Sequence, residues 1–212
     1  MTRPPRGGGR EAMIEAAVAE LRAGRQVKVL DVAAAAGVSH SLIYRQFPDG
    51  GREELIAEAY ARIFLSTSEQ DLQTTRSLSD DPDELLEELA ALYRTILSPE
   101  REEQRWSRLE ALAQARRNPL VAQHLRAARN DLIDELVTDL ANRPGWQFNQ
   151  HTTRAFATLI HSLPLGLTAM IEHDISDEEI ATIADVWARM VLAFTTTTSS
   201  VAPTSNAAVR PD

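Results

Sequence analysis

Residues 40–45 carry side chains whose types and spacing suit the recognition of DNA. Imidazole, hydroxyl, phenol and guanidinium groups can hydrogen-bond to base edges and phosphates. A leucine among them can at most contact a thymine methyl group. The predicted groove-facing residues are His40, Ser41, Leu42, Tyr44 and Arg45.

These side chains need two short helices joined by a tight turn. A helix is expected from about Val29 to Ala36, and Gly37 after it can take the positive φ of such a turn. The small Ala33 lets the second helix approach closely, and Val38 fills the angle between the helices. The spacing predicts a helix-turn-helix, although an ordinary αα-corner can also contain such a glycine.

The second helix is expected to begin at Ser39, which is a good N-cap residue. Ile43 and Phe47 are four residues apart, so they share one face of this helix. That face should hold the helix to the core and turn the polar face outward.

The string DVAAAAGVSHSLIYRQF at 31–47, with one amphipathic helix before it and the helix containing EELI after it, resembles the TetR family. The resemblance implies that Tyr44 contacts a backbone phosphate. The family usually has a lysine after the next loop, where this chain inserts Asp49-Gly50-Gly51 and has Arg52. Arg52 and the amides of the helix it opens are expected to grip a phosphate, and Lys28 is also included in the predicted DNA-binding set.

The charge distribution agrees with a DNA-binding head. The net charge is −9, which is unusual for a nucleic-acid-binding protein. Residues 1–48, however, carry seven basic and four acidic side chains, so that the remainder of the chain holds the acidic excess.

Apolar residues with helical spacing recur through the rest of the chain, and no segment shows strand alternation. The predicted fold class is all-α with about nine helices. Expected parts are a flexible basic arm (1–9), a helix-turn-helix domain (10–65), a helical ligand-binding and dimerisation domain (66–198) and a disordered tail (199–212). The arm either reaches into a minor groove or is a solubilising end.

The last two predicted helices, 151–173 and 176–197, are more apolar than one core face requires, which indicates a partner. The resemblance implies a homodimer through these helices. Predicted interface residues are Phe156, Leu159, Leu163, Leu167, Ile183, Trp187, Met190 and Phe194. Pro164 should kink the first helix or interrupt its hydrogen bonds, and together with Gly166 it either shapes a pocket or allows close helix packing.

The resemblance also implies a small-molecule effector. Candidate ligand-binding residues on the middle helices are Phe64, Tyr93, Trp106 and Leu109, and each of them can equally be plain core. The expected function is a repressor that a small, largely apolar ligand releases from a palindromic double-stranded DNA operator. The alternative is a helical small-molecule-binding protein or enzyme whose N-terminal helices are only structural.

Several other classes are excluded or disfavoured. The chain has no cysteine, which excludes disulfides and thiolate metal sites. The five histidines include no pair three or four apart, so a metal site on one helix is not expected. The acidic clusters Asp80-Asp81-Asp83-Glu84 and Asp177-Glu178-Glu179 are best explained as complements of helix dipoles. We expect no cofactor, no enzymatic activity, no membrane insertion and a cytoplasmic location.

Overall fold

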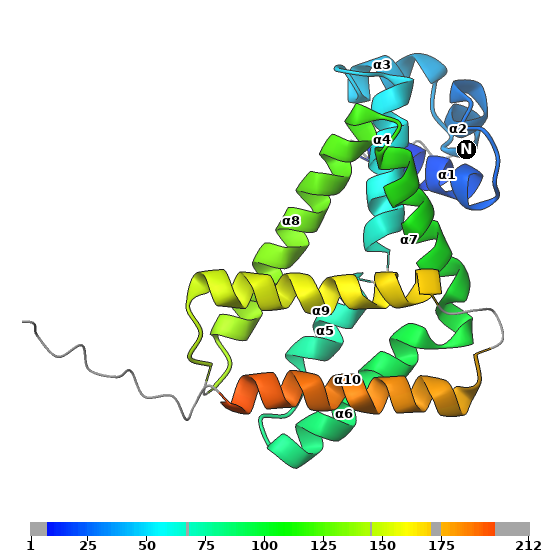
Figure 1. Cartoon of the computed structure of the whole chain (residues 1–212). Helices are drawn as coiled ribbons and strands as arrows, with labels where there is room; N and C mark the ends of the chain where they lie inside the picture. Colours follow the sequence, from blue (N-terminus) through cyan, green and yellow to red (C-terminus); the bar gives the residue numbers. More distant parts are fainter. Residues whose placement is uncertain (1–7, 67, 145, 171–174, 198–212) are drawn as a thin grey trace, which may run out of the picture.

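The computed structural model describes residues 8–66, 68–144, 146–170 and 175–197. Within these ranges the regular structure is α-helix and short 3-10 turns (Figure 1), which confirms the all-α class. The elements in order are α1 (Gly8–Arg22), α2 (Val29–Ala35), η1 (His40–Leu42), α3 (Ile43–Gln46), α4 (Arg52–Leu65), α5 (Ser68–Arg76), α6 (Pro82–Leu97), η2 (Pro99–Arg101), α7 (Glu102–Ala115), α8 (Pro119–Ala141), α9 (Gln150–Met170) and α10 (Asp177–Thr197).

The bounds of several elements differ from those expected or cannot be compared with them. Helix α1 begins at Gly8, so the last two residues of the predicted arm are helical. Residues 1–7 of that arm, the predicted tail 199–212 and the expected helix end at His173 lie outside the described residues. The polar stretch after α4 forms a helix of its own, α5, whose Leu72 is buried.

Local signals set several of the helix starts. Pro82 and Pro119 occupy the first turns of α6 and α8, where a missing N–H costs no hydrogen bond. The carboxylate of Asp81 accepts hydrogen bonds from two backbone amides of α6, and the side-chain oxygen of Asn118 does the same for α8. Helix α8 therefore starts at Pro119 for reasons that are local to its sequence.

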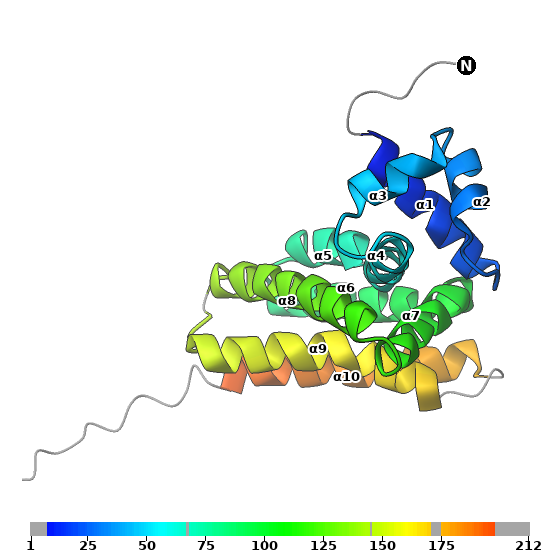
Figure 2. The same cartoon turned by 90° about the horizontal axis from the view of Figure 1, so that it is seen from above.

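Helix α4 lies between the N-terminal helices and the body. Seen from above, it runs end-on between α1 on one side and α7 and α8 on the other (Figure 2). Its residues Leu55, Ile63 and Phe64 are almost fully buried. They belong to one apolar core, which also includes Met13 of α1 and extends to Leu125 of α8 and Leu165 of α9. The division into a head (10–65) and a body (66–198) stays a prediction, and α4 is shared by both parts.

Helices α9 and α10 run side by side along one face of the body in both views. Helix α9 continues through Pro164 as one helix, although the proline has no backbone N–H to donate to the preceding turn. The hydroxyl of Thr168 donates to the carbonyl of Pro164 at 2.8 Å. Pro164 is buried and lines a cavity described below, which favours the pocket-shaping alternative.

The turn glycine provides a stability prediction. Gly37 has a φ of 66°, and an added Cβ would meet no atom within 4 Å. Gly37→Ala should therefore lower the free energy of unfolding by about 1 to 2 kcal/mol through backbone strain alone. Urea unfolding at one fixed protein concentration measures this change.

Gly166→Ala is the matched control, because its Cβ would also meet nothing within 4 Å and it lies inside a helix. It should raise stability by about 0.5 to 1 kcal/mol. Equal effects of the two substitutions would contradict the strain argument.

Candidate DNA interface and ligand cavities

The turn between α2 and the next element has the predicted geometry. Gly37 adopts the left-handed conformation, and Val38 N–H donates to the carbonyl of Ala33 at 2.9 Å. The second helix differs from expectation, since it is a 3-10 turn (η1) followed by the short α3. Ser39 precedes it without capping it through its side chain, and its hydroxyl lies 2.9 Å from that of Ser41.

Two neighbouring elements hold α3 in place. Ile43 and Phe47 are fully buried, as their spacing predicted. The guanidinium of Arg10 in α1 lies 4.9 Å from the centre of the Phe47 ring, and its Nε donates to the carbonyl of Gln46 at 3.3 Å. Arg10 also pairs with Glu58 of α4. Arg10 therefore helps to fix η1 and α3 (His40–Gln46), which together form the recognition element.

Four of the predicted groove-facing side chains, His40, Ser41, Tyr44 and Arg45, are exposed together on this element. Tyr44 is 66% exposed, which is unusual for a tyrosine packed only for stability. Lys28 is also exposed, immediately before α2.

Leu42 does not belong to this exposed set. It is half-buried against the core, and its Cδ2 would lie 3.1 Å from a Cβ added to Gly9. The prediction that Leu42 faces the groove is corrected, because η1 turns this side chain toward α1.

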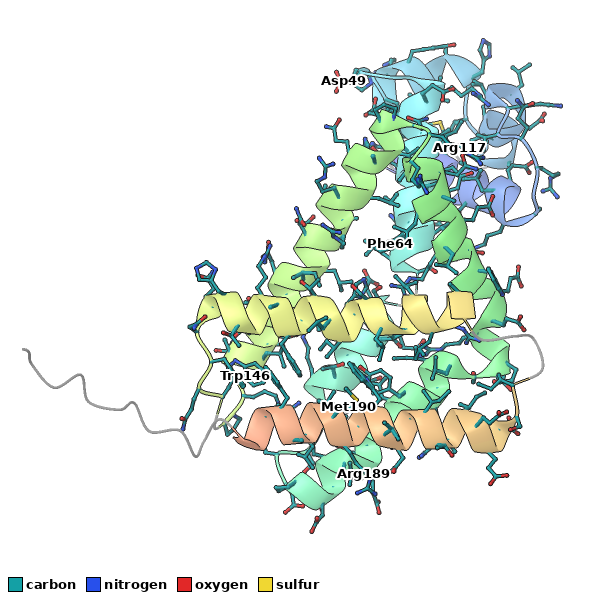
Figure 3. All side chains as sticks on the ribbon, viewed as in Figure 1. Asp49, Phe64, Arg117, Trp146, Arg189 and Met190 are labelled. Atoms are coloured by element: carbon teal, nitrogen blue, oxygen red, sulfur yellow. The ribbon has the colours of Figure 1, made fainter. Side chains whose placement is uncertain are left out.

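The loop that precedes α4 is closed by the chain itself. The backbone N–H groups of Asp49 and Gly50 both donate to the carboxylate of Glu54 at 3.1 Å. Gly51 has a φ of 54°, and an added Cβ would lie 3.2 Å from the Tyr44 ring. Gly51 thus makes room for the Tyr44 ring. Asp49 lies at the outer edge of the head (Figure 3).

Arg52 opens α4 as predicted, but its guanidinium is engaged within the chain. Its Nε donates to the carbonyl of Val27 at 2.8 Å, and its Nη1 donates to Glu53 at 2.5 Å. Arg52 therefore joins α4 to the segment before α2. The phosphate contact expected of it would have to use the remaining N–H groups of its guanidinium.

The body contains a mainly apolar cavity of about 390 Å³. It lies among α5, α6, α8, α9 and α10, and its lining includes Leu78, Leu89, Trp146, Phe156 and Val191. None of the four predicted ligand residues lines it. Phe64 is buried in the core, Leu109 packs against that core, and Trp106 is 42% exposed. Sequence reasoning missed Trp146, because it meets Phe156 only through the fold.

A second cavity of about 80 Å³ is more polar, and Tyr93 is the one predicted ligand residue in its lining. Its wall also includes Arg108, which is buried, and His161. Arg108 Nη2 lies 3.4 Å from His161 Nε2, and the guanidinium carbon lies 5.1 Å from the centre of the Phe64 ring. Burial, followed by the charge of Arg108, lowers the pKa of His161 to about 4. Sequence reasoning missed Arg108 and treated His161 as scattered, because these residues meet only through the fold.

Six of the eight predicted dimer residues are at least partly exposed. Leu159, Met190 and Phe194 are exposed at 65, 58 and 39%, while Leu163, Leu167 and Ile183 are half-buried. Val186 adds a further exposed side chain, at 52%. Met190 lies on α10 beside Arg189 (Figure 3).

Phe156 and Trp187 are corrections, because both are buried within their own chain. Phe156 stacks on Phe194 at 4.6 Å, and Trp187 meets Tyr93 edge-on at 5.3 Å between ring centres. Apolar periodicity identified them as buried but could not distinguish the core of the chain from a contact with a second copy.

Two searches of the described ranges concern other sites. No described helix is both long and apolar enough to cross a membrane. Among the same residues, no three histidine, aspartate or glutamate side chains are grouped so that they could hold a metal ion.

The fold is shared with solved structures of TetR-family regulators. A proposed TetR-family transcriptional regulator from Mesorhizobium loti has a TM-score of 0.66 at 18% identity, covering 91% of this chain and 98% of its own. The TetR family repressor AlkX from a Dietzia species, implicated in the biodegradation of n-alkanes, has a TM-score of 0.57 at 16% identity, with coverages of 92% and 98%. A proposed transcriptional regulator from Saccharomonospora viridis, in complex with choline, has a TM-score of 0.54 at 17% identity, with coverages of 85% and 95%. No protein-family model and no curated protein matches the sequence.

The pKa of His161 leads to a prediction about stability. Because this pKa falls from 6.5 to about 4 in the folded chain, the unfolded chain binds an extra proton between these pH values. The contribution of His161 is fully present above pH 6.5 and is lost as the pH falls toward 4, at a cost of at most about 3 kcal/mol.

His161→Gln removes this titration and keeps a polar side chain. Urea unfolding of both proteins from pH 7 to pH 4 should show that wild type loses stability relative to the variant. A difference that stays constant with pH would contradict the low pKa.

Proposed function

We propose that the protein is a DNA-binding transcriptional repressor that acts as a homodimer and is released from a palindromic operator by a small ligand. The observation that carries the proposal is the recognition element. Ile43 and Phe47 fix its inner face, while Tyr44 and Arg45 stand exposed on the other. Side chains on a rigid short helix can enter a major groove without further rearrangement.

The charge and the fold support the same function. The first 48 residues are net basic in a chain of net charge −9, so phosphate attraction is confined to the head. The structures with this fold include a repressor and a regulator that holds choline. The alternative, a ligand-binding protein or enzyme with a structural head, gives no reason for an exposed Tyr44 beside Arg45.

Release by a ligand requires that the body and the head be mechanically connected. Helix α4 provides this connection, since it packs on α1 and also on α7 and α8. The larger cavity, of about 390 Å³, falls within the range that holds small organic ligands. A ligand in this cavity changes the affinity for DNA only by as much as its own affinity differs between the DNA-binding arrangement of the two heads and the other arrangement. Typical coupling would weaken operator affinity about 5- to 150-fold.

The first functional prediction concerns DNA binding. With fluorescence anisotropy on DNA upstream of the protein's own gene, Tyr44→Ala should weaken binding to all sequences. Arg45→Ala should reduce discrimination against altered sites by about 1 to 3 kcal/mol if Arg45 reads a guanine.

Arg22→Ala is the matched control, because Arg22 is an exposed arginine at the end of α1, away from the recognition element. Arg22→Ala should weaken DNA binding by no more than the loss of one positive charge that acts on all DNA sequences alike. Operator binding unchanged in folded Tyr44→Ala and Arg45→Ala would remove the DNA-binding assignment.

The second functional prediction concerns assembly. Leu159→Glu and Met190→Glu place a charge on the exposed apolar face of α9 and α10, where a two-fold interface would bring two such charges together. The dimer dissociation constant should rise roughly 10- to 100-fold, and operator binding should weaken with it.

Light scattering at micromolar concentration measures the assembly. Leu112→Glu, a substitution at a 37% exposed leucine of α7, is the control and should leave the dimer intact. A wild-type monomer would defeat the dimer proposal. Trp187 is unsuitable for this test, since a charge there would disrupt the core of the chain itself.

A further inference from the structure

The polar cavity contains a buried arginine whose hydrogen-bonding capacity is incompletely used. Arg108 is 6% exposed, and its Nε has no hydrogen-bond partner among the described residues. The hydroxyl of Ser68, also 6% exposed, is likewise without a partner in the described part of the chain. Two buried donors facing one cavity require an explanation, because each unsatisfied group is costly.

The charge of Arg108 has no direct ion pair among the described residues, and the nearest carboxylate of the cavity, Asp71, acts on it only through space. Asp71 is the one carboxylate in its described lining, and it pairs with Arg101 at 2.5 Å. Burial lowers the pKa of His161, so this side chain is neutral near pH 7. The direct neighbours of the Arg108 guanidinium are the Phe64 ring and the uncharged imidazole, while Asp71 is already held by Arg101. The site therefore favours an anion.

The geometry of Arg108 favours a carboxylate. Nε and Nη2 lie on one edge of the planar guanidinium, and two parallel N–H donors match the two oxygens of a carboxylate. The cavity of about 80 Å³ is small, which suits a compact head group. Water can also occupy a polar space of this size.

The larger cavity adjoins the polar one. Thr75 and Ile160 line both, so only these side chains separate the two spaces at that point. The larger cavity is mostly apolar. The two charged groups of its described lining, Asp80 and Arg143, face each other at 3.4 Å, and Arg143 donates to the carbonyls of Leu78 and Ser79. A hydrocarbon chain fits this space better than a second charge.

We propose that the body binds an amphiphilic carboxylate, an inference that rests on the proposed function and names the ligand class. The carboxylate accepts hydrogen bonds from Arg108 and from the Ser68 hydroxyl. The hydrocarbon chain passes Thr75 and Ile160 into the cavity beside Trp146. Because Arg108 lies over Phe64 of α4, the head group acts through Arg108 on the helix that follows the recognition element.

The test compares decanoate with 1-decanol by isothermal titration calorimetry, with decanoate below its micelle concentration. Wild type should bind decanoate at least about tenfold more tightly than 1-decanol. Arg108→Met should weaken decanoate binding about 10- to 100-fold and leave 1-decanol binding nearly unchanged, because only a charge-assisted hydrogen bond is lost. Arg94→Met, at an exposed arginine of α6, should change neither.

Ser68→Ala keeps the test informative if Arg108→Met does not fold, and it should weaken decanoate binding several-fold. Equal affinities for decanoate and 1-decanol, undiminished decanoate binding in folded Arg108→Met, or no binding of either probe would overturn the proposal. No binding of either probe would mean that water fills the cavity.

Operator binding by the same wild-type protein, measured without any probe, separates the two proposals. DNA binding without decanoate binding rejects the ligand class and leaves the regulator. Decanoate binding without DNA binding does the reverse.

Discussion

The two-sided burial of α4 is the constraint on which the rest of the molecule depends. Leu55, Ile63 and Phe64 are buried in a core to which α1, α3, α7, α8 and α9 all contribute. Because packed interiors transmit displacement rather than absorb it, α4 cannot shift against the body without repacking the head. A recognition element four residues long would be unstable alone, and this shared core is what gives it a fixed position.

The polar contacts of the head complement this packing. Arg10 and Arg52 carry charges that suit DNA phosphates, but they donate to α3 and to the segment before α2, while Glu54 accepts from the loop before α4. The phenol of Tyr44 and the guanidinium of Arg45 then remain exposed on one surface of the head. Side chains that bind backbone groups of the head therefore stabilise it, and the polar side chains left without such partners remain free to contact DNA.

Local patterns predicted what depends on neighbours in sequence. The shared buried face of Ile43 and Phe47 and the turn at Gly37 both appear in the structure. Features that depend on distant segments were missed. Leu42 turns inward because η1 is a 3-10 turn, Phe156 stacks on a ring 38 residues away, and Arg108 meets His161 across 53 residues. Periodicity reports that a side chain is buried, but not by what.

The central claim is that the exposed face of α3 reads DNA as one half of a symmetric pair. Hydroxyl-radical footprinting on the DNA upstream of the protein's own gene tests this claim most directly. The account predicts two protected patches on one face of the duplex, related by a two-fold axis and centred about one helical turn, or slightly more, apart. Absence of protection at protein concentrations that saturate other regulators, or a single patch without a symmetric partner, would contradict it.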